Sequence, residues 1–575
     1  MKVPYIPEDA PFSEDQRAWL GGFLAGLHSR LSMVDAGAPS EAVVQAKPLD
    51  IVFGTQTGNS EELARSAATL AATKGYAPRV AGLDSVSMDT LAGMKDLIVV
   101  ISTYGEGEMP DNAQLFWESL TASTAPRLES LNFGVLALGD TSYEHFCRAG
   151  KLLDTRLEQL GAKRLAPRLD CDVDYEEVAD EWLRTTIPDA GAAIVDALPA
   201  RTQATWSRKS PYYGTVIDNR VLSGANSAKE IRHLAFDLAE SELEYQTGDA
   251  LGVMPINQPD LVQAWLDRLG CNAETEVDGK SVPLGELLSR RLEIATPSRE
   301  LVEGLEPLVQ DDELSHVLAG GDKEAIDTFL WGKDSLDLLN LKPDLRLDAS
   351  QIIGWLKPLQ HRAYSISSSP KAHPGEVHLT VAAVRWTTNG RVHRGVCSTY
   401  LADMVPVGEQ AGIFMMPNKS FGVPEDDSVP MIMVGPGTGI APFRAFLEER
   451  RERGAQGLNW LFFGDQHRTE DFIYADELMK MSSNGLLSRL DLAFSRDQAE
   501  KVYVQHRMLE NGHDLYGHLE EGGYFFVCGD AMRMARDVDA ALHQIVETHG
   551  CKTAEEAVAY VNDLKREKRY VRDVY

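Results

Sequence analysis

The loop from Gly54 to Ser60 has the residue types of a phosphate-binding site. It follows the apolar segment LDIVFG and precedes a predicted helix, whose free N–H groups and dipole attract an anion. The hydroxyls of Thr55, Thr57 and Ser60 and the amide of Asn59 can donate to one terminal phosphate. A triphosphate loop of the Walker type would carry a lysine, which is missing here. The loop therefore predicts a phosphate held by neutral donors.

Two further loops follow apolar segments that read as parallel strands. STYGEG (102–107) follows DLIVVIS, and GDTSYEHFC (139–147) follows FGVLALG. In an open α/β sheet, ligands bind at the carboxyl ends of the strands, where all three loops would lie. Tyr104 and Tyr143 can sandwich a flat ring, although they can also be ordinary half-buried loop aromatics. The three loops and two tyrosines together resemble the flavodoxin family, which implies FMN.

The middle of the chain carries the residue types of an FAD site. In RAYS (362–365), arginine can bind a pyrophosphate, tyrosine can stack on a ring and serine can bond a ring edge. The segment GVCST (395–399) opens a second helix that can bind an anion. Thr380 to Ala382 lies on a predicted strand, and Trp386 can stack on adenine. RAYS alone matches by chance, but the combination with GVCS predicts FAD.

A third nucleotide site is predicted near the C-terminus. The glycine-rich GPGTGIAPFR (435–444) follows the strand MIMV, so its backbone can approach a pyrophosphate. Arg496 and Lys501 then place two positive charges after a strand end in an acidic protein. They are either a solvated pair or the site of the extra ribose phosphate that distinguishes NADPH from NADH.

Cys528 and Tyr575 are candidates for the reaction centre. Cys528 ends the last long apolar strand, where a buried structural thiol is the ordinary outcome. It also follows the nucleotide loops, in the position where chemistry would occur. Tyr575 is the last residue, and a terminal aromatic stays ordered only when it packs on something, for which a flavin ring is a candidate.

The elements around these loops divide the chain into distinct units. We expect an N-terminal helix and linker over 1–48, a flavodoxin-like FMN domain over 49–188 and a linker over 189–211. An FAD-binding antiparallel β-barrel follows over 212–422, with a helical insertion at about 258–356. An NADP-binding α/β domain of the ferredoxin-reductase type covers 423–575. The fold class is thus multidomain α/β plus a β-barrel.

The N-terminal segment is an amphipathic helix by its apolar spacing. Trp19, Phe23, Leu27 and Leu31 recur on one helical face. This face either docks on its own chain or joins subunits, so we expect a homo-oligomer through the N-terminal segment.

Composition narrows the class of protein. The chain of 575 residues has 87 acidic and 56 basic residues, and its net charge of −31 disfavours nucleic acid and membrane lipid. No apolar window reaches the roughly 20 residues of a membrane span, and no secretory signal is visible. The six cysteines are too widely spaced for zinc or iron–sulfur motifs. These features predict a cytoplasmic protein with reduced thiols and no metal.

The order of motifs TQTGN, RAYS, GVCS, GPGTGIAPFR, SRDQAEKVYVQ and VCGDAMRMARD resembles the diflavin reductase family over residues 49–575. Within it, the chain is most similar to the flavoprotein (alpha) subunits of NADPH-dependent assimilatory sulfite reductases. The segments FSEDQRAWLGGFLAGL, GDTSYEHFCRAGKLLDTRLEQLGAKRL and YVRDVY carry this narrower likeness.

The resemblance implies a relay in which NADPH gives a hydride to FAD, and electrons pass singly to FMN. FMN then reduces the haem/iron–sulfur (beta) subunit of sulfite reductase. The residues it implies for FMN are Thr55, Gln56, Thr57, Gly58, Asn59, Ser60, Ser102, Thr103, Tyr104, Gly105, Leu138, Gly139, Asp140, Thr141, Ser142, Tyr143, Glu144, His145, Phe146 and Cys147. Those for FAD are Thr296, Arg362, Ala363, Tyr364, Ser365, Thr380, Val381, Ala382, Trp386, Gly395, Val396, Cys397, Ser398 and Tyr575. Those for NADPH are Ser495, Arg496, Lys501, Val502, Tyr503, Val504, Gln505 and Asp537. The hydride-transfer centre comprises Ser365, Cys528, Asp573 and Tyr575.

Two departures from the family pattern and two other functions stay in view. TYGEGEMPDNAQ, with Tyr104, is closer to reductases that serve haem-thiolate monooxygenases, which favours a soluble diflavin reductase for another haem acceptor. Cys397 stands where alanine is usual and would add a redox-sensitive thiol near FAD. A nucleotide-binding sensor without turnover is the third function, and the set of Ser365, Cys528, Asp573 and Tyr575 counts against it.

The predicted FMN domain is itself acidic. It has Glu106, Glu108 and Asp111 beside the second loop and a further acidic run over 170–177. These carboxylates are either a solvated surface or a docking face for a basic patch on the electron acceptor.

Overall fold

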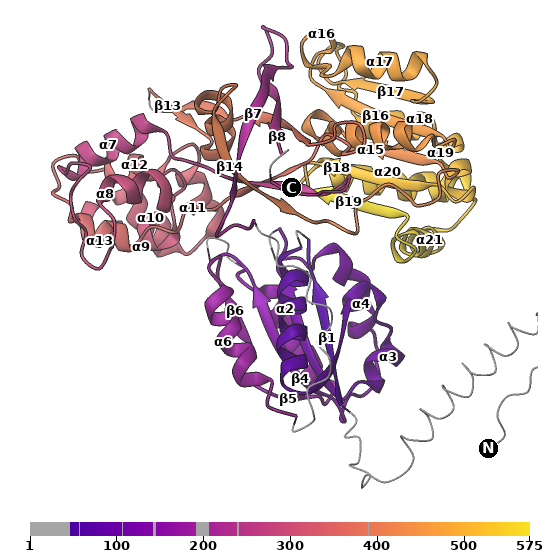
Figure 1. The fold of residues 1–575 in the computed structure, drawn as a ribbon, viewed down its shortest axis with the longest axis horizontal. Coiled ribbons are helices and arrows are strands. Elements are labelled where there is room, and N and C mark those ends of the chain that lie inside the picture. Colours follow the sequence, from indigo (N-terminus) through magenta and orange to yellow (C-terminus); the bar gives the residue numbers. More distant parts are fainter. Residues whose placement is uncertain are drawn as a thin grey trace, which may run out of the picture.

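The computed structural model describes residues 46–575, apart from 57, 106, 142–144, 191–205, 239–240 and 389. Figure 1 shows the flavodoxin-like part below, the barrel in the centre, a helical region on the left and a second α/β part on the right. The predicted N-terminal helix lies outside the described residues. Its linker does not extend to residue 48, because Lys47 and Pro48 already belong to the first strand. Among the described helices, none has the length and apolar character needed to cross a bilayer.

The flavodoxin-like part is a parallel sheet covered by helices on both faces. Its strands are β1 (Lys47–Gly54), β2 (Tyr76–Gly82), β3 (Asp96–Ser102), β4 (Asn132–Leu138), β5 (Lys163–Arg164) and β6 (Leu169–Cys171). Its helices are α2 (Asn59–Thr73), α3 (Met88–Gly93), α4 (Asp111–Thr121), α5 (Arg148–Gln159) and α6 (Glu176–Thr186). The strand order is β2-β1-β3-β4-β5, and β6 also pairs with β4. Neighbours Ile98 and Val99 of β3 belong to separate buried clusters, which explains the unbroken apolar run.

The central part is an antiparallel barrel. Its strands are β7 (Tyr212–Val221), β8 (Glu230–Asp237), β9 (Ala250–Met254), β10 (Arg362–Ser365), β11 (Glu376–Ala383) and β14 (Gln410–Met416). They follow the order β10-β9-β14-β7-β8-β11, and a bridge between Ile366 and Leu379 links the two edges. A hairpin of β12 (Arg385–Thr388) and β13 (Arg391–Arg394) and the short helix α14 (Val396–Thr399) complete it.

A helical region is inserted between β9 and β10. Its helices are α7 (Pro259–Leu269), α8 (Leu284–Glu286), α9 (Arg299–Val309), α10 (Asp312–Gly320), α11 (Lys323–Leu330), α12 (Ser335–Leu339) and α13 (Ala349–Gly354). They enclose their own apolar core around the fully buried Trp265. The insertion therefore places RAYS, on β10, far along the chain from its neighbour strand β9.

The C-terminal part is a second parallel α/β sheet. Its strands are β15 (Met431–Val434), β16 (Asn459–Asp465), β17 (Arg489–Phe494), β18 (Tyr524–Gly529) and β19 (Tyr570–Val574). Its helices are α15 (Ile440–Arg453), α16 (Arg468–Asp471), α17 (Ala475–Ser483), α18 (Val504–Glu510), α19 (Gly512–Glu520), α20 (Met534–His549) and α21 (Ala554–Arg566). The strand order is β17-β16-β15-β18-β19.

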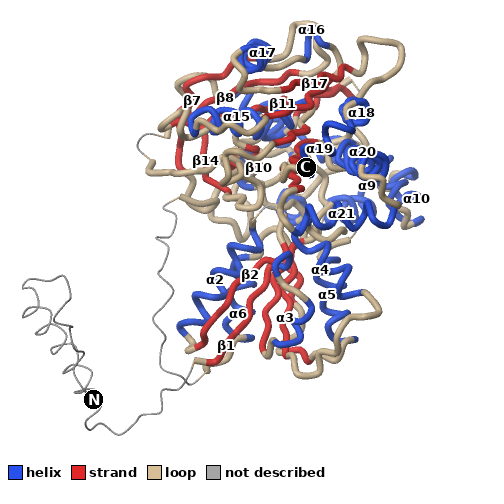
Figure 2. Tube along the Cα trace, turned by 90° about the vertical axis from the view of Figure 1, so that its right-hand side faces the viewer, coloured by secondary structure: helices blue, strands red, loops and turns tan. Residues whose placement is uncertain are grey.

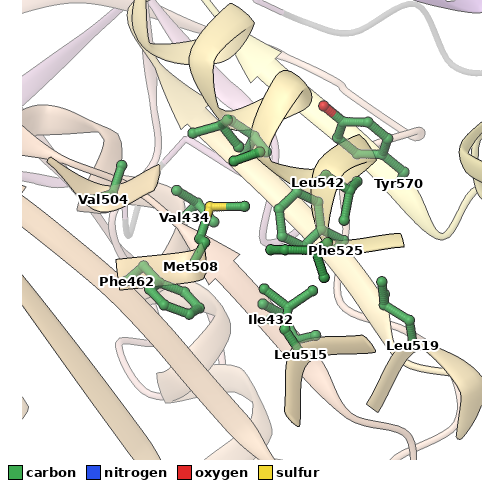
Figure 3. Close-up of a cluster of buried hydrophobic side chains, with 14 of the residues drawn as sticks. Ile432, Val434, Phe462, Val504, Met508, Leu515, Leu519, Phe525, Leu542 and Tyr570 are labelled. Atoms are coloured by element: carbon green, nitrogen blue, oxygen red, sulfur yellow. The ribbon is translucent and has the colours of Figure 1, made fainter. Parts of the chain in front are cut away.

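One face of this sheet packs against α18 to α21 through the core shown in Figure 3. Ile432, Val434 and Phe525 from the strands meet Met508, Leu515, Leu519 and Leu542 from the helices. Tyr570 of β19 joins the same core, so the last strand is held by side-chain packing as well as by its pairing with β18. The predicted fold class is confirmed, with two parallel α/β parts, an antiparallel barrel and a helical insertion.

Candidate functional site

The three loops predicted for FMN lie together at the carboxyl edge of the flavodoxin-like sheet. The Ser102 hydroxyl donates to the Gly54 carbonyl over 3.4 Å, which joins the first two loops. The Thr103 N–H donates to the Leu138 carbonyl over 3.0 Å, which joins the second and third. Thr57 and residues 142–144, including Tyr143, lie outside the described residues.

The first loop fits a phosphate. Gly58, which caps α2, has φ +90, a conformation that favours glycine, and its N–H donates to the Thr55 hydroxyl over 2.9 Å. The Ser60 hydroxyl in the first turn of α2 is fully buried and has no hydrogen-bond partner in the described part of the protein. A buried hydroxyl without a partner is costly, and a phosphate oxygen at the helix start would satisfy it.

The FAD candidates do not all gather at one place. Arg362 pairs with Glu293 over 3.3 Å, and Glu293 also accepts the Thr296 N–H over 3.1 Å. Both residues thus contact Glu293, and a contact of Thr296 with FAD stays a prediction. Burial raises the pKa of Cys397 to about 12, so its thiol is protonated at neutral pH. The expected redox-sensitive thiol is therefore not supported, because the thiolate is the reactive form.

Two other FAD candidates use their side chains elsewhere. The Thr380 hydroxyl lies 2.8 Å from the Tyr474 hydroxyl in the C-terminal part. Trp386, which is 36% exposed, stacks on His393 at 5.3 Å and donates to the Gly332 carbonyl over 3.0 Å. Contacts of Thr380 and Trp386 with FAD therefore stay predictions.

The third nucleotide site is built around glycine and free cations. A Cβ on Gly439 would lie 2.2 Å from the Cys528 carbonyl, so only glycine lets the loop approach β18 this closely. Arg496 and Lys501 are exposed, and within the described residues neither forms an ion pair. Gln505 donates to Asp537 over 3.0 Å, which brings two of the predicted NADPH residues together. These features fit an additional phosphate.

The residues predicted for hydride transfer converge at the end of β19. In the pairing of β18 with β19, Cys528 lies opposite Asp573. The Ser365 hydroxyl from the barrel donates to the Asp573 carboxylate over 2.6 Å, and the Cys528 thiol lies 3.9 Å from it. Tyr575 reaches the glycine-rich loop, with its hydroxyl 2.8 Å from that of Thr438. The structure thus joins residues that are up to 208 positions apart in the sequence.

Burial controls the charges in this cluster. Burial raises the pKa of Asp573 above its usual range, and the hydrogen bond from Ser365 partly offsets this. Burial also raises the pKa of Cys528 strongly, with a further contribution from the nearby Asp573 carboxylate. The thiol is therefore protonated at neutral pH, donates a hydrogen bond to Asp573 and is not a nucleophile.

The same strand contacts the FMN loops, which the sequence did not predict. The Tyr104 hydroxyl donates to the Val574 carbonyl over 2.9 Å. Arg572 forms an ion pair with Asp111, with Nε 3.1 Å from the carboxylate. Figure 1 and Figure 2 both place the C-terminus where the flavodoxin-like part meets the rest. RDVY at the end of the chain was a usable signal, but its partner Asp111 lies 461 positions away.

We expect Asp573→Asn to slow hydride transfer from NADPH by about 10- to 150-fold, the value of a charge-assisted hydrogen bond of about 1.5–3 kcal/mol. The substitution keeps the shape but removes the negative charge beside Ser365. Stopped-flow absorbance of flavin reduction measures the rate, and flavin content per chain is the control. An unchanged rate with normal flavin content would contradict a role for this carboxylate.

We expect Arg496→Ala and Lys501→Ala each to weaken the binding of NADPH by about 10- to 150-fold and the binding of NADH far less, because only NADPH carries the extra phosphate. Steady-state kinetics with both nucleotides measure the difference. Arg468→Ala, at another arginine of the same part, is the control. Equal losses for NADPH and NADH would show that these cations do not recognise the ribose phosphate.

Comparison with known proteins agrees with this division of the chain. The Flavodoxin family description matches residues 51–182, the FAD binding domain 204–400 and the Oxidoreductase NAD-binding domain 433–540. The sulfite reductase (NADPH) flavoprotein alpha-component of Bacillus subtilis (strain 168) is 42% identical over 98% of this chain and 96% of its own length. The protein of the same name from Vibrio cholerae serotype O1 is 42% identical over 97% of this chain and 93% of its own length. The one from Yersinia enterocolitica is 38% identical over 98% of this chain and 96% of its own length. With three matched domains and nearly full-length similarity, this chain belongs to the family of sulfite reductase (NADPH) flavoprotein alpha-components.

Proposed function

We propose that this protein takes electrons from NADPH through FAD and FMN and delivers them to a haem/iron–sulfur partner subunit that reduces sulfite to sulfide. The observation that carries the proposal is the double role of β19. Its Asp573 faces Ser365 and Cys528, and its Arg572 and Val574 contact the FMN loops. One strand thus borders both ends of an electron path.

The residues that would hold each group follow from the site. The loop from Thr55 to Ser60 would hold the FMN phosphate, Arg362 and the start of α14 the FAD pyrophosphate, and Arg496 with Lys501 the NADPH ribose phosphate. FAD, when bound, accepts a hydride from NADPH, and FMN passes the electrons on one at a time. The protein's part is to place these groups and to exclude water.

Asp573 has the clearest chemical task. Departure of a hydride leaves a positive charge on the nicotinamide ring, and a buried carboxylate stabilises a developing cation more strongly than an exposed one. Ser365 orients this carboxylate through its 2.6 Å hydrogen bond. Tyr575, which is 62% exposed at the chain end, is placed where it can cover or uncover the site.

The terminal reaction requires a second polypeptide. Reducing sulfite to sulfide takes six electrons and a metal centre, and the six cysteines of this chain are unpaired and widely spaced. The relatives are themselves named alpha-components, which supports a partner subunit. We assign self-association to residues 1–48 and place the protein in the cytoplasm, since free thiols persist in a reducing compartment.

The acidic face of the flavodoxin-like part contacts the protein's own cations. Across this boundary, every ion pair among the described residues has its carboxylate on the flavodoxin side. The pairs are Glu61–Lys419, Asp84–Lys568, Glu108–Arg536, Asp111–Arg572, Asp172–Lys357, Asp174–Arg208 and Glu176–Arg208. Of the acidic residues expected to be solvated or to face a partner, Glu108, Asp111, Asp172, Asp174 and Glu176 thus pair with cations of the same chain. Asp170 pairs within the flavodoxin-like part, Glu177 is exposed, and Glu106 lies outside the described residues. We infer that a basic acceptor competes with these cations for the same carboxylates.

The proposed activity is tested by mixing the purified flavin-loaded protein with the beta subunit of its own host. We expect NADPH-dependent sulfide production, with three NADPH oxidised per sulfide, only when both are present. Asp573→Asn in the same complex is the control for electron flow through this chain. Rapid NADPH-dependent reduction of a different haem protein with no sulfide would favour the diflavin reductase alternative.

Competition at the acidic face makes a separate prediction. Replacing Lys419 and Lys568 together by Ala removes the cross-boundary partners of Glu61 and Asp84. We expect acceptor reduction to accelerate by about 2- to 30-fold at low salt, from about 0.2–1 kcal/mol per exposed pair. Arg566→Ala is the matched control, since Arg566 pairs with Asp563 within α21 and with none of the carboxylates at the boundary. Rates equal to wild type in the double variant would show that these pairs do not limit access.

A further inference from the structure

A cluster of two histidines and one glutamate lies where the barrel meets the C-terminal part. His373 precedes β11, and Glu376 and His378 are the first and third residues of that strand. The three residues follow the pattern H-x-x-E-x-H. The His378 Nε2 atom lies 3.0 Å from the Glu376 carboxylate, and the His373 Nδ1 atom lies 3.8 Å from it. The two imidazole rings are 4.2 Å apart. None of these residues belongs to the site described above.

These separations suit a tetrahedral metal ion. Zinc binds histidine nitrogen and carboxylate oxygen at about 2.0–2.2 Å, which places neighbouring ligand atoms roughly 3.3 Å apart. The observed 3.0 and 3.8 Å bracket this value, so small side-chain movements would complete the geometry. Histidine and carboxylate are also the ligand types that zinc accepts when cysteine is absent.

The second nitrogen of His373 is already oriented by a carboxylate. Its Nε2 lies 3.0 Å from Glu448 of α15, which is only 3% exposed. Glu448 is itself held by the Ser369 N–H and by Arg444, each at 3.0 Å. A carboxylate behind a histidine fixes the tautomer that turns the free lone pair to a metal. His373 therefore presents Nδ1 toward Glu376 as a ligand would.

His378 is prepared in a different way. It is 5% exposed, its Nδ1 atom has no hydrogen-bond partner in the described part of the chain, and the His233 ring packs on it at 4.9 Å. The buried surroundings thus hold the His378 ring in place. Its Nε2 points to the half-exposed Glu376, which leaves the cluster open to an entering ion.

A second cluster of carboxylate and histidine side chains is not suited to bind a metal ion. Asp334, Asp337 and His393 are equally close, but the Arg391 guanidinium pairs with both carboxylates and occupies the position of a cation. Among the described residues, no lysine or arginine pairs with Glu376, because Arg444 is directed to Glu448. The charge of the first cluster is therefore available to an ion.

We propose that His373, Glu376 and His378 bind one Zn²⁺ ion, with water in the fourth position. The spacing of the cysteines predicted no metal, but it says nothing about a site built from histidine and glutamate. The ion would join His373 to the first residues of β11. Because His373 also contacts Glu448, the ion would link β11 to α15, which follows the glycine-rich loop. It would thus stiffen the boundary between the barrel and the C-terminal part without touching the reaction centre.

The test uses the full-length, flavin-loaded protein after removal of metals by a chelator. Equilibrium dialysis against buffered Zn²⁺, with metal measured by mass spectrometry, gives the number of ions and their affinity. We expect Glu376→Gln and His378→Asn each to lose one equivalent or to bind it at least tenfold more weakly. Glu448→Gln should weaken zinc binding by about 10- to 100-fold, as expected for a carboxylate that orients a metal-binding histidine. His513→Asn, at an exposed histidine paired with Asp514, is the matched control.

X-ray absorption at the zinc edge keeps the proposal testable if a variant folds poorly. For the wild-type protein we expect only nitrogen and oxygen neighbours at about 2.0–2.2 Å with the imidazole signature. Sulfur near 2.3 Å would assign the ion to a cysteine and overturn the proposal. Equal zinc content in wild type, Glu376→Gln and His378→Asn, or none in any of them, would overturn it as well.

Discussion

The last strand of the chain must stay in place at a terminus, where chains ordinarily fray. β19 does so because it pairs with β18 from Tyr570 to Val574 and buries Tyr570 in the core of Figure 3. The Tyr570 hydroxyl also donates to Asp539 over 2.9 Å. With the strand held, Asp573 meets Ser365 of the barrel, and Arg572 meets Asp111 of the flavodoxin-like part. The meeting of three domains therefore depends on one edge strand.

The domains carry opposite charges where they contact one another. The flavodoxin-like part contributes carboxylates at its loop edge, and the barrel, the helical insertion and the C-terminal part contribute lysines and arginines. Exposed pairs of this kind are individually weak and sensitive to salt. Arg572 and Asp111 form the least exposed of these pairs, with side chains that are 18% and 26% exposed and joined by hydrogen bonds. The least exposed pair is thus surrounded by more exposed ones, whose carboxylates a basic partner can bind in place of the protein's own cations.

Local sequence patterns predicted the parts of the site that lie on strand–loop–helix units. The loop after β1 and the glycine-rich loop after β15 could be located because apolar strands and helix starts leave a local signature. Asp573 came from likeness to a family alone, whereas Ser365 and Cys528 were also indicated by their own motifs. The pairing register explains why Cys528 and Asp573 meet. Glu293 beside Arg362 and Asp111 beside Arg572 escaped prediction, because such pairs join residues distant in the chain. The direction of the Thr380 side chain could not be predicted either. Both faces of β11 are buried, so the sequence does not alternate between apolar and polar residues.

The central claim is that β19 couples the hydride site to the FMN loops through Arg572 and Asp111. It is tested most directly by a double-mutant cycle of Asp111→Asn and Arg572→Gln, with stopped-flow absorbance separating FAD reduction by NADPH from electron transfer between the flavins. The account predicts that each variant and the double variant slow the inter-flavin step by the same factor, about tenfold or more for a buried charged pair, because all three remove one interaction. Fully additive slowing, or a wild-type inter-flavin rate in all three, would contradict it.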